Sequence, residues 1–189
     1  MVNQGVLWDG QKKGRDTLPL TQAEFNSLVE EHGTTLYRIS YRMIGDAQDA
    51  EDVVQETLRS AWKSRSRYKS GHSDRAWLAA ILRRRVVDHW RKRKPLHLAT
   101  SSGDLEVGID ADDPLANDYT DEMQAALNLL HQELRETLLL VIVGGLTHQE
   151  VADMLKIPLG TVLSRVSRAR RYLRGFLMAE KRLREGSVT

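Results

Sequence analysis

The segment from Leu146 to Arg171 constrains the fold most, because it has the start and stop signals of two short helices separated by a turn. Thr147 is followed three residues later by Glu150, the spacing of a capping box that begins a helix. The run Ile157-Pro158-Leu159-Gly160 predicts a break, since proline blocks helix continuation and glycine frees the backbone. Thr161 can then cap a second helix. This pattern is typical of a helix-turn-helix, which places its second helix in the major groove of DNA.

The predicted second helix carries one apolar stripe, and the rest of its surface is basic. The stripe consists of residues at helical spacing that we expect to face the core: Val162, Val166, Ala169 and Leu173. No acidic residue occurs from Lys156 to Ala179. The pattern indicates a DNA-binding helix, and the alternative is a small helical hairpin with a solvated basic face.

Composition favours an all-α protein of one or two small domains. The chain has 189 residues, of which 29% are charged and 6% aromatic, with four prolines. It contains no cysteine, which excludes disulfides, thiolate metal sites and a cysteine nucleophile. This fits a reducing cytoplasm. Without an apolar run of about eighteen residues, no membrane insertion is expected.

The net charge of +2 conceals strong segregation of charge along the chain. Residues 46–56 are acidic without Lys or Arg, and residues 59–94 are basic except for Asp74 and Asp88. The stretch between Lys94 and Arg135 contains acids but no Lys or Arg. Turn-forming residues in the last stretch predict a flexible acidic linker. We therefore expect a flexible N-terminal extension (1–20), a helical domain (21–94), the linker (95–119), a second helical domain (120–179) and a C-terminal tail (180–189).

Four helices are expected in the first domain. Thr21 and Glu24 form a capping box for the first, and the second is predicted over Thr35–Ile44, ending near Gly45. The third covers about Ala47–Ser64 with acidic first turns. After a basic loop, Ser73 is expected to cap a long helix that reaches about Lys92.

Aromatic residues are interleaved with the cations of this domain. Cations follow phosphates while aromatic faces stack on bases, so the combination suits single-stranded or melted nucleic acid. Trp62 and Trp77 are flanked by apolar residues and are expected in the core, whereas Tyr68 lies in a polar loop and is the stronger stacking candidate.

Signals for catalysis are weak. The six histidines are scattered without metal-ligand spacing, and no glycine-rich phosphate loop occurs. The carboxylates of the acidic helix are expected to have no histidine partner. We predict no catalytic residue, no metal site and no cofactor.

Two groups of motifs, in this order, resemble a known family. The first comprises Gly45-Asp-Ala-Gln-Asp-Ala-Glu-Asp-Val-Val-Gln-Glu-Thr-Leu58, Ala61-Trp62, Arg75-Ala-Trp-Leu-Ala-Ala-Ile-Leu82 and Asp88-His-Trp-Arg-Lys-Arg93, and resembles sigma region two. The second comprises Gly145-Leu-Thr-His-Gln-Glu-Val-Ala152, Ile157-Pro-Leu-Gly-Thr-Val-Leu-Ser-Arg165 and Arg168-Ala-Arg170, and resembles sigma region four. Together, over about residues 21–178, they are similar to an extracytoplasmic-function (ECF) sigma factor of the sigma-70 family.

The resemblance implies a subunit that directs bacterial RNA polymerase to promoters and melts the DNA. It implies that an acidic helix docks on the clamp helices of the largest polymerase subunit through Asp49, Glu51, Asp52, Gln55 and Glu56. The second domain would also touch the polymerase flap, and the linker would thread toward the active-site and RNA-exit channels. An anti-sigma factor is a common partner in the family.

The resemblance also implies two DNA-binding sets. The minus-ten set is Arg67, Tyr68, Lys69, Arg83, Arg84 and Arg91, and the minus-thirty-five set is Thr161, Ser164, Arg165, Ser167, Arg168 and Arg171. Within the latter, Ser164, Ser167 and Arg168 are expected to reach base edges, and the other arginines to hold phosphates. Leu163 and His131 depart from the family pattern, which commonly has a basic residue and a proline at these positions.

Two other classes of function stay open on the residues alone. One is a free-standing transcriptional regulator whose first domain senses a signal or dimerises. The other is a nucleic-acid-processing enzyme that uses the basic domain as a substrate platform. Co-purification with core RNA polymerase separates a sigma factor from the regulator, and metal-dependent nuclease or ligase activity would indicate the enzyme.

Overall fold

Helices form the framework of the protein, as the predicted all-α class requires. The computed structural model describes residues 20–68, 73–93 and 121–186, and no strand occurs within them. The elements are α1 (Gln22–Ile44), α2 (Ala47–Lys63), the 3-10 turn η1 (Arg65–Arg67), α3 (Asp74–Arg93), α4 (Asp121–Leu129), α5 (Gln132–Ile142), α6 (His148–Leu155) and α7 (Leu159–Gly186). The predicted linker and nearly all of the predicted N-terminal extension lie outside the described residues.

The prediction of two helices between Thr21 and Ile44 was wrong, because α1 is continuous through Gly33. Its buried side chains, which include Leu28, His32, Leu36 and Ile39, keep helical spacing on both sides of the glycine. Packing of this face on α2 and α3 therefore outweighs the cost of about 1 kcal/mol for a glycine inside a helix. The helix begins at the predicted capping box and ends at Gly45, whose φ of 83° is the left-handed conformation that glycine favours.

The predicted boundaries of α2 and α3 are confirmed. The Asp46 side chain accepts a hydrogen bond from the Asp49 backbone N–H at 2.8 Å, which caps α2. The Ser73 hydroxyl accepts one from the Ala76 N–H at 3.2 Å, as expected for the start of α3. Both caps satisfy N–H groups that a helix leaves unpaired at its N-terminus.

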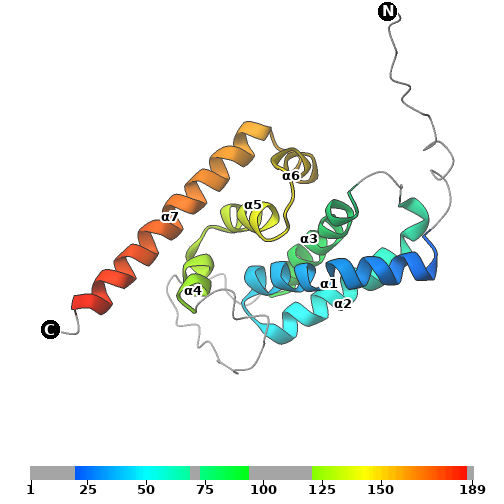
Figure 1. Cartoon of the computed structure of the whole chain (residues 1–189), viewed down its shortest axis with the longest axis horizontal. Helices are drawn as coiled ribbons and strands as arrows, with labels where there is room; N and C mark the ends of the chain where they lie inside the picture. Colours follow the sequence, from blue (N-terminus) through cyan, green and yellow to red (C-terminus); the bar gives the residue numbers. More distant parts are fainter. Residues whose placement is uncertain (1–19, 69–72, 94–120, 187–189) are drawn as a thin grey trace, which may run out of the picture.

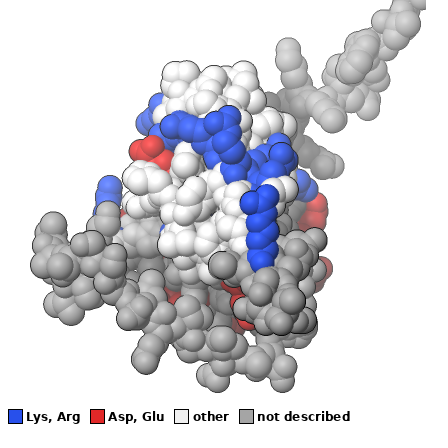
Figure 2. All heavy atoms as spheres, turned by 90° about the vertical axis from the view of Figure 1, so that its left-hand side faces the viewer, with Lys and Arg blue, Asp and Glu red and all other residues white. Residues whose placement is uncertain are grey.

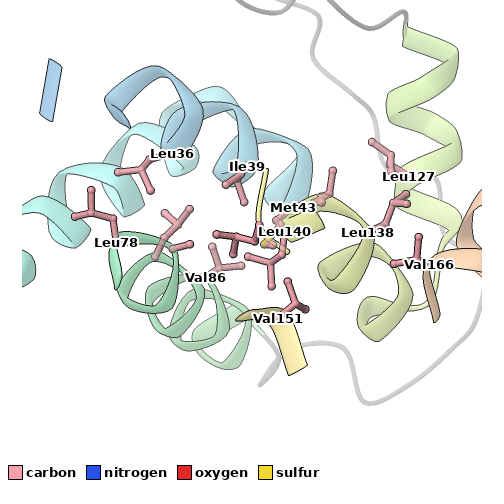
Figure 3. Packing of buried hydrophobic residues seen from close by; sticks show 14 of the residues in the cluster. Leu36, Ile39, Met43, Leu78, Val86, Leu127, Leu138, Leu140, Val151 and Val166 are labelled. Carbon is pink, nitrogen blue, oxygen red and sulfur yellow. The ribbon is translucent and has the colours of Figure 1, made fainter. Parts of the chain in front are cut away.

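The N-terminal half (α1–α3) and the C-terminal half (α4–α7) lie against each other, with α4 and α5 between α1 and α7 (Figure 1). A single cluster of buried apolar residues runs through both halves. Figure 3 shows Ile39 and Met43 of α1, Val86 of α3, Leu140 of α5 and Val151 of α6 pointing into the same region. The two halves therefore share a core in this arrangement.

Polar contacts also join the two halves. Arg42 of α1 donates to Gln124 Oε1 of α4 at 2.9 Å, and Arg135 of α5 donates to the Met43 carbonyl at 3.1 Å. Arg83 of α3 pairs with Glu136 of α5, with 2.7 Å between Nε and Oε1. Charged groups at this junction have partners, as burial requires.

Candidate nucleic-acid interface

α6, the turn after it and α7 form the predicted helix-turn-helix. The Thr147 hydroxyl accepts from the Glu150 N–H at 3.2 Å, and Glu150 Oε2 accepts from the Thr147 N–H at 2.8 Å, so the capping box is confirmed. The hydrogen bond from the Thr147 backbone N–H, together with one from the Thr147 hydroxyl to the same carboxylate, lowers the pKa of Glu150 below its ordinary value. Buried Val151 and Ala152 hold α6 on the core, which fixes where α7 begins.

The turn differs from the prediction in two details. The chain reverses at Lys156, whose φ of 56° is left-handed, whereas Gly160 already belongs to α7. Because α7 begins at Leu159, Thr161 lies inside its first turn rather than at the cap. Proline at position 158 explains the early start, since its restricted φ suits the entry to a helix. Thr161 is half-buried.

The exposed face of α7 carries most of the predicted minus-thirty-five set. The four predicted stripe residues, beginning with Val162 and Val166, are buried, which turns the opposite face to solvent. Ser164, Ser167, Arg168 and Arg171 are exposed on that face. Figure 2, which looks onto the side where α7 lies, shows a band of Lys and Arg side chains with few acids beside it. Cations gathered on one face attract the phosphates of nucleic acid.

The Arg165 side chain points toward α5 and not outward from this face. Its Nη2 lies 2.5 Å from Glu133 Oε2 of α5, and its side chain is only 15% exposed. An arginine held by a carboxylate has lost part of its capacity to hold a phosphate. In this conformation, Arg165 connects α7 to α5 instead.

Tyr68 is anchored by its own domain. Its hydroxyl donates a hydrogen bond to Asp74 at the start of α3, and its ring lies 4.9 Å from that of Trp77, tilted by 58°. Burial raises the pKa of Tyr68 above its ordinary value, and the hydrogen bond to Asp74 and the negative charge of Asp74 raise it further. The hydroxyl therefore stays a donor. Trp62 and Trp77 pack against the core as predicted.

The structure separates the arginines of the minus-ten set. Arg84 and Arg91 are exposed and lie two turns apart on one face of α3. Arg83 points elsewhere, to Glu136. Lys69 lies outside the described residues, and for Arg67 the structure places only the backbone, in η1.

The acidic residues of α2 divide in the same way. Glu51, Asp52 and Gln55 are exposed. Glu56 is paired with Arg59 at 3.7 Å. Asp49 instead faces α3, where its Oδ2 lies 3.7 Å from His89 Nε2, so the expectation of no histidine partner was wrong for this carboxylate. The outward acidic surface is therefore formed by Glu51 and Asp52, next to Gln55.

Glu133 and Glu136 were missed as partners of the predicted DNA-binding arginines. They are spaced i, i+3 on α5, so both project from one side of that helix. Glu133 belongs to the acidic block visible in the sequence, but nothing in that block indicates which cation it meets. Glu136 is 5% exposed, and a charge so deeply buried requires a partner.

The part of the chain that the structure describes shows neither a metal-binding group nor a membrane-spanning helix. There, no group of three or more His, Asp or Glu side chains is placed to hold a metal ion. Nor does any helix within that part have the length and apolarity needed to cross a membrane.

Comparison with known proteins assigns both halves. The family model for Sigma-70 region 2 matches residues 28–95, and that for Sigma-70, region 4 matches residues 120–173. The boundary between the matches falls at the predicted linker.

Curated relatives extend over most of the chain. ECF RNA polymerase sigma factor SigW of Bacillus subtilis is 28% identical, over 81% of this chain and 88% of SigW. EcfG of Rhodopseudomonas palustris is 31% identical, over 77% of this chain and 81% of EcfG. SigE of Mycolicibacterium smegmatis is 33% identical, but the chain spans only 61% of the length of SigE.

Solved structures give the same result. The sigma factor RpoE from Bartonella quintana, in complex with the anti-sigma factor NepR, matches with a TM-score of 0.67 at 27% identity, over 82% of this chain and 97% of RpoE. CnrH, in complex with the cytosolic domain of CnrY, matches with a TM-score of 0.64 at 27% identity, over 84% of this chain and 90% of CnrH. The chain belongs to the ECF RNA polymerase sigma factors, which bind RNA polymerase and recognise promoters.

Proposed function

We propose that this sigma factor works through three separate surfaces, one for each element of the initiation complex. The exposed face of α7 contacts the minus-thirty-five element, the exposed side of α3 and the loop before it contact the minus-ten element, and α2 docks on the polymerase clamp helices. It acts by binding in the cytoplasm, without catalysing a reaction. Its two DNA-binding surfaces belong to the two predicted domains, about 21–94 and 120–179, whose apolar cores are continuous in this arrangement.

The observation that carries this proposal is the α7 face. It combines a capped helix-turn-helix with exposed Ser164, Ser167, Arg168 and Arg171 on one side. Recognition helices present their N-terminal residues to base edges. Ser164, Ser167 and Arg168 are therefore the base-reading candidates, and Arg171 holds phosphate.

On the minus-ten side, Arg84 and Arg91 supply the exposed cations that follow the DNA backbone. Tyr68, with Arg67 and Lys69 next to it in the chain, supplies the stacking surface for unpaired bases. Arg83 joins this set only if its pair with Glu136 opens.

On the polymerase side, Glu51, Asp52 and Gln55 form the docking surface. Glu56 lies at the border of this surface, beside Arg59. Asp49 lies on the side of α2 that faces α3, next to His89. An anti-sigma partner is part of the proposal, because RpoE in the matched structure is bound to one.

Run-off transcription with purified core RNA polymerase on a genomic library tests the function. We expect promoter-specific transcripts only when the chain is added. The double variant Glu51→Lys/Asp52→Lys should lose polymerase binding, because it reverses charge on the exposed acidic face. The control Glu30→Lys changes an exposed acid of α1 and should bind normally. An absence of transcripts and of polymerase binding by the unmodified chain would refute the proposal.

A further inference from the structure

Leu163 is an apolar residue in the part of α7 that faces DNA in the proposed function. It is the fifth residue of the helix, and 49% of it is exposed. The core does not need it, because Val162 at 0% exposed and Val166 at 3% already fill the buried side of this turn. Packing within the chain therefore does not explain a leucine at this position.

Leu163 projects from this end of the helix beside Leu159, which lies at i−4 and is 41% exposed. Gly160, Ser164 and Ser167 lie at i−3, i+1 and i+4, and all three are small and exposed. A Cβ atom on Gly160 would meet nothing within 4 Å, so open space lies beside the leucine. Small residues let a helix approach a partner closely, which would bring the Leu163 side chain into contact with it.

The surrounding charge identifies that partner as nucleic acid. One to three turns further along the same helix lie exposed Arg168, Arg171 and Arg174, with no acid up to Ala179. These cations attract phosphates, while leucine neither donates nor accepts a hydrogen bond. The apolar group that a base edge offers in the major groove is the C5-methyl of thymine.

We propose that Leu163 determines promoter specificity by contacting the methyl group of a thymine in the minus-thirty-five element. The inference rests on the proposed function of the α7 face and adds a particular base to it. Ser164, Ser167 and Arg168 then recognise neighbouring positions by hydrogen bonds, and Leu163 contributes the apolar contact.

Deoxyuridine provides the test, because it differs from thymidine only by lacking this methyl group. The holoenzyme, assembled from core polymerase and the full chain, is measured on its preferred promoter duplex with each minus-thirty-five thymidine replaced in turn. At one position we expect affinity to fall about fourfold, which corresponds to the roughly 0.8 kcal/mol gained by burying one methylene-sized apolar group. The variant Leu163→Ala should bind both duplexes equally.

The matched control is Leu129→Ala, which removes another exposed leucine, 59% exposed, from α4. It should keep the preference for thymidine. Unchanged melting temperatures would show that both variants fold.

Two results would overturn the proposal. In the first, the unmodified holoenzyme binds every deoxyuridine duplex as tightly as the parent duplex. In the second, Leu163→Ala keeps the thymidine preference, and if it also weakens binding to core polymerase, the leucine is assigned to a protein contact. If the unmodified chain neither assembles with polymerase nor binds a promoter, the proposed function itself fails, and the two failures are thereby distinguished.

Discussion

Glu136 shows how one residue makes the molecule sensitive to pH. Its burial raises the pKa of its carboxyl, and this effect exceeds the opposite one of Arg83. A carboxyl with a raised folded-state pKa stabilises the fold while protonated, and that contribution is lost as pH rises through the raised pKa. We expect wild type to lose unfolding free energy relative to Glu136→Gln as pH rises from about 4.5, the ordinary glutamate value, toward neutrality. Urea denaturation at a series of pH values measures the difference.

Glu30→Gln is the control for Glu136, because Glu30 is an exposed glutamate on α1. Its unfolding free energy should follow that of wild type at every pH. Parallel pH profiles for wild type and Glu136→Gln would contradict the assignment of Glu136 as a buried titrating group.

Tyr68 combines a structural role with a proposed DNA-binding role, and substitution separates the two. Tyr68→Phe keeps the ring but removes the hydrogen bond to Asp74, so it should cost about 0.5–1.5 kcal/mol of unfolding free energy while promoter opening is retained. Tyr68→Ala should also reduce opening, because stacking of a base on an aromatic ring contributes about 1–3 kcal/mol. Permanganate footprinting reports opening, and thermal melting reports stability. Normal opening by Tyr68→Ala would leave Tyr68 a purely structural residue.

At the scale of the element, the capping box of α6 sets the start of the helix-turn-helix. Thr147→Ala removes the side-chain acceptor for the Glu150 N–H and should cost about 0.5–2 kcal/mol in thermal or urea unfolding. The control is Thr34→Ala, an exposed position inside α1, where alanine is a better helix former and no loss is expected. An equal effect of the two substitutions would show that the cap contributes nothing specific.

At the scale of the whole molecule, Arg135 tests whether the two halves unfold together. Its guanidinium donates to the carbonyls of Met43, Asn128 and Leu130, which links α5 to the end of α1. Burial lowers the pKa of Arg135 from its ordinary value. Arg135→Met leaves buried carbonyls without this donor and should cost about 1–3 kcal/mol.

Tryptophan fluorescence makes the Arg135 test specific to one half. Trp62, Trp77 and Trp90 lie in α2 and α3, whereas Arg135 lies in α5. In a Trp8→Phe background, fluorescence follows unfolding of the N-terminal half alone, whereas helical circular dichroism follows unfolding of both halves. Arg135→Met should shift the two unfolding transitions by the same amount. Arg59→Met, at a side chain 65% exposed, should shift neither by more than about 0.5 kcal/mol. A change in circular dichroism alone would mean that the halves unfold independently.

Local signals in the sequence were enough to predict the fold class, the helix-turn-helix and most helix boundaries. Capping boxes at Thr21 and Thr147 act within three residues, and the apolar stripe of α7 repeats within one helix. Such features are encoded by neighbours along the chain, so they can be recognised without the tertiary structure. The outward position of Ser164, Ser167 and Arg168 follows from the same stripe.

The tertiary structure decided which charged residues are available for binding. Asp49, Arg83 and Arg165 have the same local character as their exposed neighbours, yet they pair with His89, Glu136 and Glu133. Packing also decided that α1 continues through Gly33. These outcomes depend on contacts between residues far apart in the chain, and a local pattern of charge or hydrophobicity does not contain the identity of a distant partner.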